Sequence, residues 1–194
     1  MHKIVIANWK LNPNSEEKAL ELAVSSDVEG LSIAPPFVFL EAVAGVLKHA
    51  KLAAQDVSPH ASGAYTGETS PQMLKNIGVQ FVIVGHSERR RFEHETEEVI
   101  AEKMRAAEEA RLIPVLCIGE SAEERGLGRT KSVLERQLHI GLLHLPRGDR
   151  NRFVIAYEPV WAIGSGKPST PENTAEIISF LEHHCFSREI ALFE

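Results

Sequence analysis

Residues 153–167 read FVIAYEPVWAIGSGK, and this stretch decides the fold class. Its first four residues, Phe153–Ala156, form a short apolar run, which is typical of a buried strand in a parallel sheet. A carboxylate, Glu158, stands at the end of that run and is followed by a rigid Pro-Val-Trp corner, a small-residue loop with Gly164, and a stiff stretch from Lys167. A permissive tip between stiff hinges is expected of a loop that closes over a substrate, so Glu158 at its base is a candidate proton-transfer group.

Five further apolar runs precede this one, with helical patterns between them. The six expected strands are Lys3–Ala7, Leu31–Ala34, Lys51–Gln55, Val79–Val84, Ile113–Ile118 and Phe153–Tyr157. Asn14 and Glu17 predict a capping box for the first helix, residues 130–145 carry apolar side chains at helical spacing, and Pro171 opens a last helix. This alternation predicts a single α/β domain over residues 1–194, with a parallel sheet covered by helices.

The composition excludes several classes of partner. The hydrophobic content of 43% and charged content of 25% are ordinary for a soluble globular protein, and the net charge of -6 argues against nucleic acid or an anionic membrane. Two cysteines, Cys117 and Cys185, do not make a disulfide framework. The N-terminus enters a strand at once, without a charged-then-apolar leader. We therefore expect a cytoplasmic protein.

The tail contains a short run of possible metal ligands, His183-His184-Cys185. Adjacent residues on a helix point in different directions, and no second ligand pair in the sequence has the spacing of a zinc site. We therefore expect neither a metal nor a cofactor.

Polar side chains follow three of the predicted strands at the point where each strand ends. Asn8 and Lys10 come after the first, His86 and Glu88 after the fourth, and Glu158 after the sixth. Because the carboxyl ends of parallel strands converge on the active site, we expect these residues around one mouth. A lysine, a histidine and a glutamate there suit acid–base chemistry on a small anion. Lys10 would supply charge, His86 a polarising hydrogen bond and Glu158 the base.

Four motifs occur in order along the chain. They are Asn8-Trp9-Lys10, Gly63-Ala64-Tyr65-Thr66-Gly67-Glu68, Gly85-His86-Ser87-Glu88-Arg89-Arg90 and Tyr157-Glu158-Pro159-Val160-Trp161-Ala162-Ile163-Gly164. This set resembles the triosephosphate isomerase family, and the resemblance extends from Lys3 to about Glu182. It implies a (βα)8 TIM barrel and an aldose–ketose isomerase of glycolysis and gluconeogenesis. Such an enzyme interconverts D-glyceraldehyde 3-phosphate and dihydroxyacetone phosphate through an enediolate, without a cofactor.

The resemblance also implies the roles of the reacting groups. Glu158 would abstract the proton next to the substrate carbonyl, and a neutral His86 would polarise that carbonyl and shuttle protons between the two oxygens. Lys10 would neutralise the phosphate and the developing enediolate. Asn8 would orient the carbonyl, and Glu88 would position the neighbouring polar groups.

Three more residues take roles from the resemblance. The loop from Ala162 to Lys167 would close and offer the Gly164 amide to the phosphate. Thr66, in the family's interdigitating dimer loop, would reach into the partner subunit's site. Cys117 would support the catalytic strand.

The length departs from the family pattern. A family barrel has eight strands in about 250 residues, whereas this chain has 194. We therefore expect a C-terminally truncated barrel of six to seven βα units, in which Ile190–Phe193 would begin strand seven. Its end, and strand eight, would be lacking. The loss of phosphate-binding contacts would cost roughly 3–9 kcal/mol, because each charge-assisted hydrogen bond contributes about 1.5–3 kcal/mol.

Two alternatives follow from that departure. The chain would be a catalytically weak or inactive isomerase-like scaffold, or a fragment that needs another chain to complete the barrel. An incomplete barrel leaves unpaired edge strands and exposes apolar interior residues to water. This open seam and the Gly63–Glu68 loop both favour a homo-oligomer that binds a small phosphorylated triose.

Overall fold

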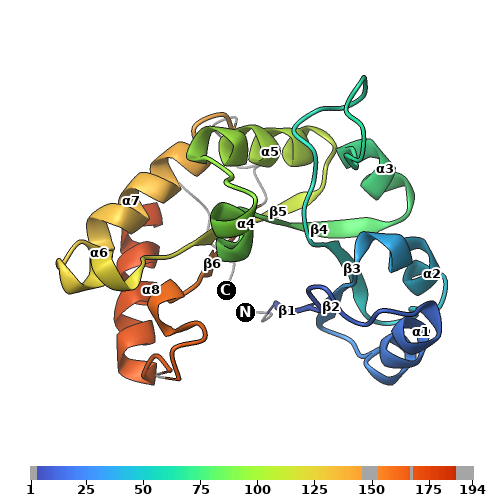
Figure 1. Cartoon of the computed structure of the whole chain (residues 1–194), viewed down its shortest axis with the longest axis horizontal. Coiled ribbons are helices and arrows are strands. Elements are labelled where there is room, and N and C mark those ends of the chain that lie inside the picture. The colour runs from blue at the N-terminus through green and yellow to red at the C-terminus, as the bar shows by residue number, and fades with distance from the viewer. Residues whose placement is uncertain (1–3, 146–152, 167, 187–194) are drawn as a thin grey trace.

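The framework of the fold is a curved sheet of six parallel strands. The computed structural model describes residues 4–145, 153–166 and 168–186. Each strand pairs with the strands before and after it in the chain, in the order β1-β2-β3-β4-β5-β6. Figure 1 shows the strands turning through an arc with the helices arranged around its outer side, so the expected incomplete α/β barrel is confirmed. The strands are β1 (Val5–Asn8), β2 (Leu31–Ala34), β3 (Lys51–Ala54), β4 (Val79–Val84), β5 (Ile113–Ile118) and β6 (Val154–Tyr157).

The helices connect successive strands. They are α1 (Glu16–Ser25), α2 (Leu40–Ala44), α3 (Pro71–Asn76), α4 (Ser87–Phe92), α5 (Glu97–Glu109), α6 (Ala122–Gly126), α7 (Thr130–Gly141) and α8 (Pro171–Phe186), with short 3-10 turns η1 (Phe37–Phe39) and η2 (Val160–Ala162). The expected proline at the start of the last helix is confirmed. No helix in the described part of the chain has both the length and the apolar character needed to cross a membrane.

The start of α1 differs from the sequence prediction. Ser15, rather than Asn14, is the N-cap, and its Oγ accepts a hydrogen bond from the Lys18 amide at 3.4 Å. The predicted pairing of Asn14 with Glu17 was therefore wrong by one residue, because serine and asparagine are both strong N-cap residues and stand side by side here.

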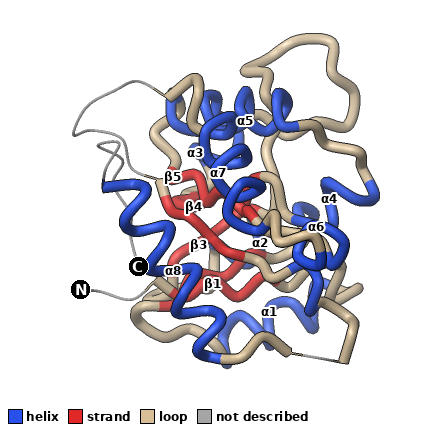
Figure 2. The backbone as a smooth tube through the Cα atoms, turned by 90° about the vertical axis from the view of Figure 1, so that its left-hand side faces the viewer, coloured by secondary structure: helices blue, strands red, loops and turns tan. Residues whose placement is uncertain are grey.

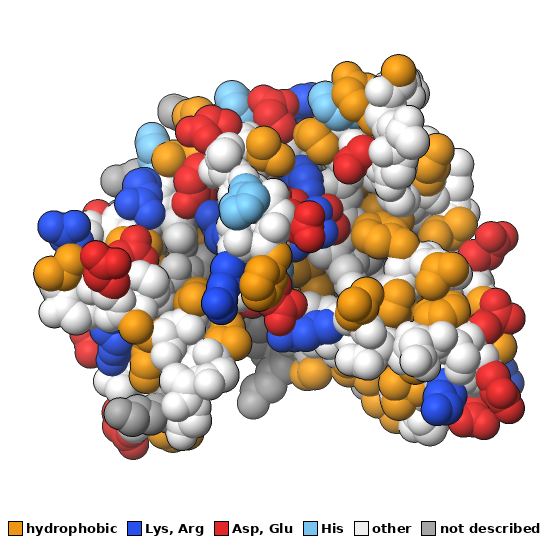
Figure 3. Space-filling view, viewed as in Figure 1, with side chains coloured by type: hydrophobic (Ala, Val, Ile, Leu, Met, Phe, Trp, Pro, Cys, Tyr) orange, Lys and Arg blue, Asp and Glu red, His pale blue; other side chains and the backbone are white. Residues whose placement is uncertain are grey.

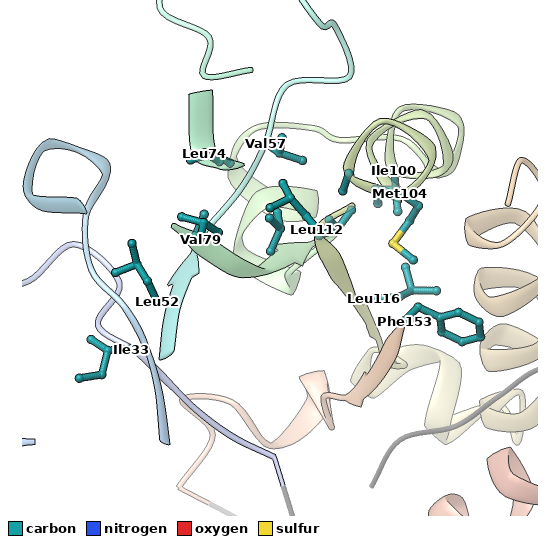
Figure 4. Close-up of a cluster of buried hydrophobic side chains, with 14 of the residues drawn as sticks. Ile33, Leu52, Val57, Leu74, Val79, Ile100, Met104, Leu112, Leu116 and Phe153 are labelled. Atoms are coloured by element: carbon teal, nitrogen blue, oxygen red, sulfur yellow. The ribbon is translucent and has the colours of Figure 1, made fainter. Parts of the chain in front are cut away.

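The main core lies between the outer face of the sheet and the helices that cover it. Figure 4 shows Leu116 beside Met104 and Ile100 on α5, with Val79 and Ile33 farther along the same buried layer. All five are fully or almost fully buried. Complete burial of a side chain of this size contributes roughly 1.5–3 kcal/mol, so this layer fixes the sheet against the helices.

A second apolar cluster occupies the inner, concave face of the sheet. It contains Phe81, Ile83, Val115 and Cys117, which alternate along β4 and β5 with outward-facing residues. On the edge strands Ile6 and Ala156 are only partly buried, whereas these four mid-sheet side chains are each no more than 5% exposed. The curl of the sheet packs them against one another, and the ammonium of Lys51 lies 5.7 Å from the centre of the Phe81 ring.

A buried ion cluster fixes the chain between β3 and α5. Lys103, on α5, lies 2.7 Å from Asp56 and 2.6 Å from Glu95, and Arg89 on α4 lies 2.9 Å from Asp56. The side chains of Lys103 and Glu95 are 5% and 6% exposed. The two cations and two carboxylates balance each other, which buried charges require.

The connections that carry the polar motifs gather at one end of the sheet. Figure 2 shows α4 and α6 together at that end, beyond the strands. The predicted strand Ile190–Phe193 and Lys167 lie outside the described residues.

Candidate active site

The end of β1 presents Asn8 and Lys10. Asn8 Oδ1 accepts a hydrogen bond from the Lys10 amide at 2.9 Å. Lys10 has a φ of 54°, in the left-handed region that non-glycine residues rarely adopt. The side chain of Gln55 stabilises this backbone, because its amide nitrogen donates to the carbonyls of Lys10 at 2.8 Å and Ala34 at 2.9 Å. These hydrogen bonds fix the main chain at Lys10 and so determine where its side chain begins.

The end of β4 presents His86 as the N-cap of α4. Its Nδ1 accepts a hydrogen bond from the Glu88 amide at 3.2 Å. A ring nitrogen that accepts a hydrogen bond carries no proton, so the proton of the neutral imidazole belongs on Nε2. Nε2 lies 2.8 Å from Glu158 Oε1. The backbone of α4 thus selects the tautomer that offers an N–H donor to the mouth of the sheet.

The end of β6 presents Glu158, whose amide continues the ladder by donating to the Ile118 carbonyl at 2.8 Å. Its Oε2 accepts a hydrogen bond from the Ser87 amide at 2.9 Å, while Oε1 faces His86. The side chains of His86 and Glu158 are 12% and 16% exposed. Glu158 is thus a mostly buried carboxylate that accepts a hydrogen bond through one oxygen and lies beside the His86 imidazole with the other.

Lys10 and Glu88 connect the first strand to α4. Lys10 Nζ lies 2.6 Å from Glu88 Oε1, and the amide of Glu88 is the donor to His86 Nδ1. The two side chains of the pair are 45% and 41% exposed, so solvent screens their attraction. Figure 3 shows acidic and basic side chains side by side over α4 in the middle of this face. Contacts thus join Lys10, Glu88, His86 and Glu158 into one chain of polar groups.

The tip of the loop after β6 contains two glycines in the left-handed region. Gly164 and Gly166 have φ values of 69° and 70°, which suit glycine, and Ser165 Oγ donates to the Ala162 carbonyl at 2.9 Å. The Arg125 guanidinium lies 4.4 Å from the centre of the Trp161 ring. The base of the loop therefore rests on α6.

Thr66 is exposed on the loop between β3 and α3. Tyr65 beside it is 45% exposed and stacks on His60, with ring centres 3.6 Å apart. The contribution of Thr66 to a neighbouring subunit stays a prediction.

Glu120 is a buried carboxylate that sequence reasoning did not single out. It is 0% exposed, and it accepts hydrogen bonds from Tyr157 at 3.1 Å and from Arg125 at 3.0 Å. Burial and the neighbouring Glu120 charge raise the pKa of Tyr157 to about 12. Glu120 thus links the strand that carries Glu158 to α6.

Gly119 is a second residue that sequence reasoning missed. A Cβ atom at this position would stand 1.8 Å from the Glu158 carbonyl oxygen, so only glycine fits. The side chain of Gln137 on α7 bonds to both main-chain groups of Gly119. It accepts a hydrogen bond from the Gly119 amide at 2.8 Å and donates one to the Gly119 carbonyl at 3.2 Å. A glycine followed by an acid directly after a strand was the available signal.

Cys117 lies under the site on the inner face of β5. Burial raises the pKa of its thiol well above the ordinary value, and the nearby Glu158 carboxylate adds to that effect. The thiol is therefore protonated near neutral pH, which suits a packing residue and not a nucleophile.

Comparisons with known proteins give the family. The sequence profile described as "Triosephosphate isomerase" matches residues 3–191. A protein of that name from Sodalis glossinidius is 44% identical over all of this chain and 79% of its own length. The same name belongs to a Fusobacterium nucleatum protein, 44% identical over 91% of this chain and 74% of its own length. A Photorhabdus laumondii protein of that name is 42% identical over 98% of this chain and 78% of its own length. With a profile match over nearly the whole chain and the predicted site residues at one end of the sheet, the chain belongs to the triosephosphate isomerase family.

Proposed function

We propose that this chain is an intramolecular aldose–ketose isomerase that interconverts D-glyceraldehyde 3-phosphate and dihydroxyacetone phosphate. Family membership and the name shared by the three relatives support this activity. The observation that carries the chemistry is the 2.8 Å contact between His86 Nε2 and Glu158 Oε1. This contact between an imidazole nitrogen and a carboxylate supports the proposal, because proton transfer next to a carbonyl needs a base and a hydrogen-bond donor close together.

The reaction begins when a substrate carbonyl takes the position in front of His86 Nε2. Glu158 then accepts the proton from the carbon next to that carbonyl. The electron pair of the broken C–H bond forms the C=C bond of an enediolate, and the N–H of His86 stabilises the charge that develops on oxygen. Glu158 returns the proton to the neighbouring carbon. His86 gives its Nε2 proton to the charged oxygen and takes the hydroxyl proton from the other oxygen, which becomes the new carbonyl, so both groups are regenerated and no other reactant is consumed.

Lys10 supplies the positive charge in this scheme. Its ammonium is paired with Glu88 at 2.6 Å, and an exposed pair of this kind is weak enough for an anionic substrate to displace. Asn8 holds the Lys10 main chain and orients the carbonyl, while Glu88 aligns Lys10 and His86. The exposed Gly164 amide, in the loop after η2, binds the phosphate.

The assembly and location of the chain are further parts of the proposal. We propose a homo-oligomer in which Thr66 approaches the partner's site. The loop that carries Thr66, between β3 and α3, projects from the molecule in Figure 1, and Leu11 is 90% exposed; both observations support a homo-oligomer. Sedimentation velocity at micromolar concentration tests it.

One continuous six-stranded sheet supports a single domain. The unpaired, buried Cys117 supports a cytoplasmic location.

A coupled isomerase assay on the purified chain tests the activity. Glu158→Gln should lower kcat by about 10²–10⁴-fold, which is the usual contribution of a general base. The matched control is Glu123→Gln, at an exposed position on α6, which should leave kcat unchanged. Turnover that survives in Glu158→Gln would exclude Glu158 as the base. The absence of turnover in the unmodified chain would refute the proposed activity.

A further inference from the structure

The strand that leads to His86, β4, separates from its neighbour β5 just below the site. The last paired residues of β4 and β5 are Val84 and Leu116. Beyond that pair, β4 turns away at Gly85, which has a φ of 70°, and continues into His86. On its other side β5 pairs with β6. The Glu158 amide continues this pairing by donating a hydrogen bond to the Ile118 carbonyl. The gap between β4 and β5 therefore determines the distance from the imidazole to the carboxylate.

The guanidinium of Arg90 fills this gap. Its Nε donates to the Gly85 carbonyl at 2.7 Å and its Nη2 donates to the Cys117 carbonyl at 3.1 Å. These carbonyls belong to the first residue after the end of β4 and to the residue after Leu116 in β5. One residue beyond the last backbone pair of β4 and β5, the Arg90 side chain thus supplies the hydrogen bonds that hold the two strands together.

The same side chain is itself held in place. Arg90 Nη1 lies 2.9 Å from Glu97 Oε1 at the start of α5, and both side chains are 18% exposed. The Arg90 amide donates to the His86 carbonyl at 3.1 Å, so Arg90 and His86 share one helical turn. A Cβ atom at Gly85 would lie 3.1 Å from Nη2, which shows how closely the guanidinium packs against the backbone.

We infer that Arg90 is a positioning residue of the isomerase, which sets the separation of His86 and Glu158 by bridging the two strand ends. This inference rests on the proposed function for its effect on turnover, but not for its effect on geometry. The planar fork of arginine reaches two carbonyls and a carboxylate at once. A lysine ammonium is a single point charge, so it cannot hold both strand ends in the same arrangement.

Steady-state kinetics of Arg90→Lys and Arg90→Ala test the inference. The matched controls are Arg91→Lys and Arg91→Ala, since Arg91 is an exposed neighbour on the same helix. We expect kcat to fall by about 10–100-fold in the Arg90 variants, because a displacement of about 1 Å can cost 10²-fold. KM should change by less than about threefold, because Arg90 acts on the reacting groups and not on phosphate binding. If kcat matches the Arg91 controls and only the melting temperature falls, Arg90 is a stability residue and the inference is wrong.

Two further measurements separate this inference from the proposed activity. In protein labelled with ¹⁵N-histidine, the imidazole signals that disappear in His86→Gln should shift in the Arg90 variants and stay in place in the Arg91 controls. Guanidinium at about 50 mM, well below denaturing concentrations, should restore part of the turnover of Arg90→Ala and of no other variant. If the unmodified chain has no turnover, the proposed activity is refuted, and the His86 signals alone then test the positioning role of Arg90. Unshifted signals overturn the positioning role.

Discussion

A single added methyl group at Gly119 should disable the site without touching any reacting atom. A Cβ atom there would lie 1.8 Å from the Glu158 carbonyl oxygen and 2.8 Å from its carbonyl carbon. Real Cβ atoms almost never come closer than 3.0 Å to such an atom, so the Cβ and the oxygen must separate by a further 1.2 Å. Both are attached to main chain, and neither can rotate away. The displacement therefore passes to the end of β6 and to the Glu158 side chain.

The magnitude follows from that distance. A misplacement of about 1 Å can lower the rate by 10²-fold, so Gly119→Ala should reduce kcat by roughly that factor. Overpacking of this kind costs about 1–3 kcal/mol of folding free energy. For a chain of this size, that corresponds to a melting temperature lower by roughly 2–12 °C, at about 2–4 °C per kcal/mol. The assay is steady-state isomerisation at a temperature where circular dichroism shows both proteins folded.

Gly126→Ala is the control, because a Cβ atom at Gly126 meets nothing within 4 Å. It lies at the end of α6, a few residues from Gly119, and should leave both kcat and stability almost unchanged. If Gly119→Ala retains kcat within about twofold of the unmodified chain, the close approach of Gly119 to Glu158 does not control the base, and the reasoning from 1 Å displacements fails.

Three other predictions follow from buried groups. Lys103→Met should lower the free energy of unfolding by about 3–5 kcal/mol in urea titrations, because it leaves the carboxylates of Asp56 and Glu95 with Arg89 as the one cation of the cluster; a loss below about 1 kcal/mol would contradict the burial of the pair. The pKa of Tyr157 is about 12 in the folded chain and about 10 when unfolded, so the unfolded state releases its proton first. The free energy of unfolding, measured with urea, should thus fall as the pH rises from about 10 to 12. In the Tyr157→Phe variant it should fall less steeply over the same range. The high pKa and burial of Cys117 predict that, in a Cys185→Ser background, a disulfide reagent modifies it only after denaturation; fast labelling of the folded chain at pH 8 would exclude that protection.

The strands and their polar ends were predictable because their signals are local. The bounds of β2, β4 and β5 match the predicted runs, and the other strands differ by one or two residues at their ends. The placement of His86 and Glu158 follows from where polar residues interrupt apolar runs, since parallel strands bring their carboxyl ends together. The family motifs then added roles that local reasoning could not assign.

The supporting contacts were not predictable because they join residues far apart in the chain. Arg90 belongs to a run of three arginines, residues 89–91, and nothing in that run indicates which side chain bridges β4 and β5. No feature of the sequence around Glu120 predicts the hydrogen bond that it accepts from Tyr157, 37 positions later in the chain. The packing of Phe81 on the inner face was not predictable either, because sequence patterns give the side of a strand but not the curvature that packs it against its neighbours.

The sequential order of the strands has a consequence for how the chain is made. Every strand finds its partner in the strand synthesised immediately before it, so no segment has to wait for a distant part of the polypeptide. Domains fold during synthesis from the N-terminus, and nearby pairings form fastest. The sheet can therefore grow by one strand and one helix at a time at the ribosome exit. In that order the segment that carries His86, between β4 and α4, is synthesised before the strand that leads to Glu158.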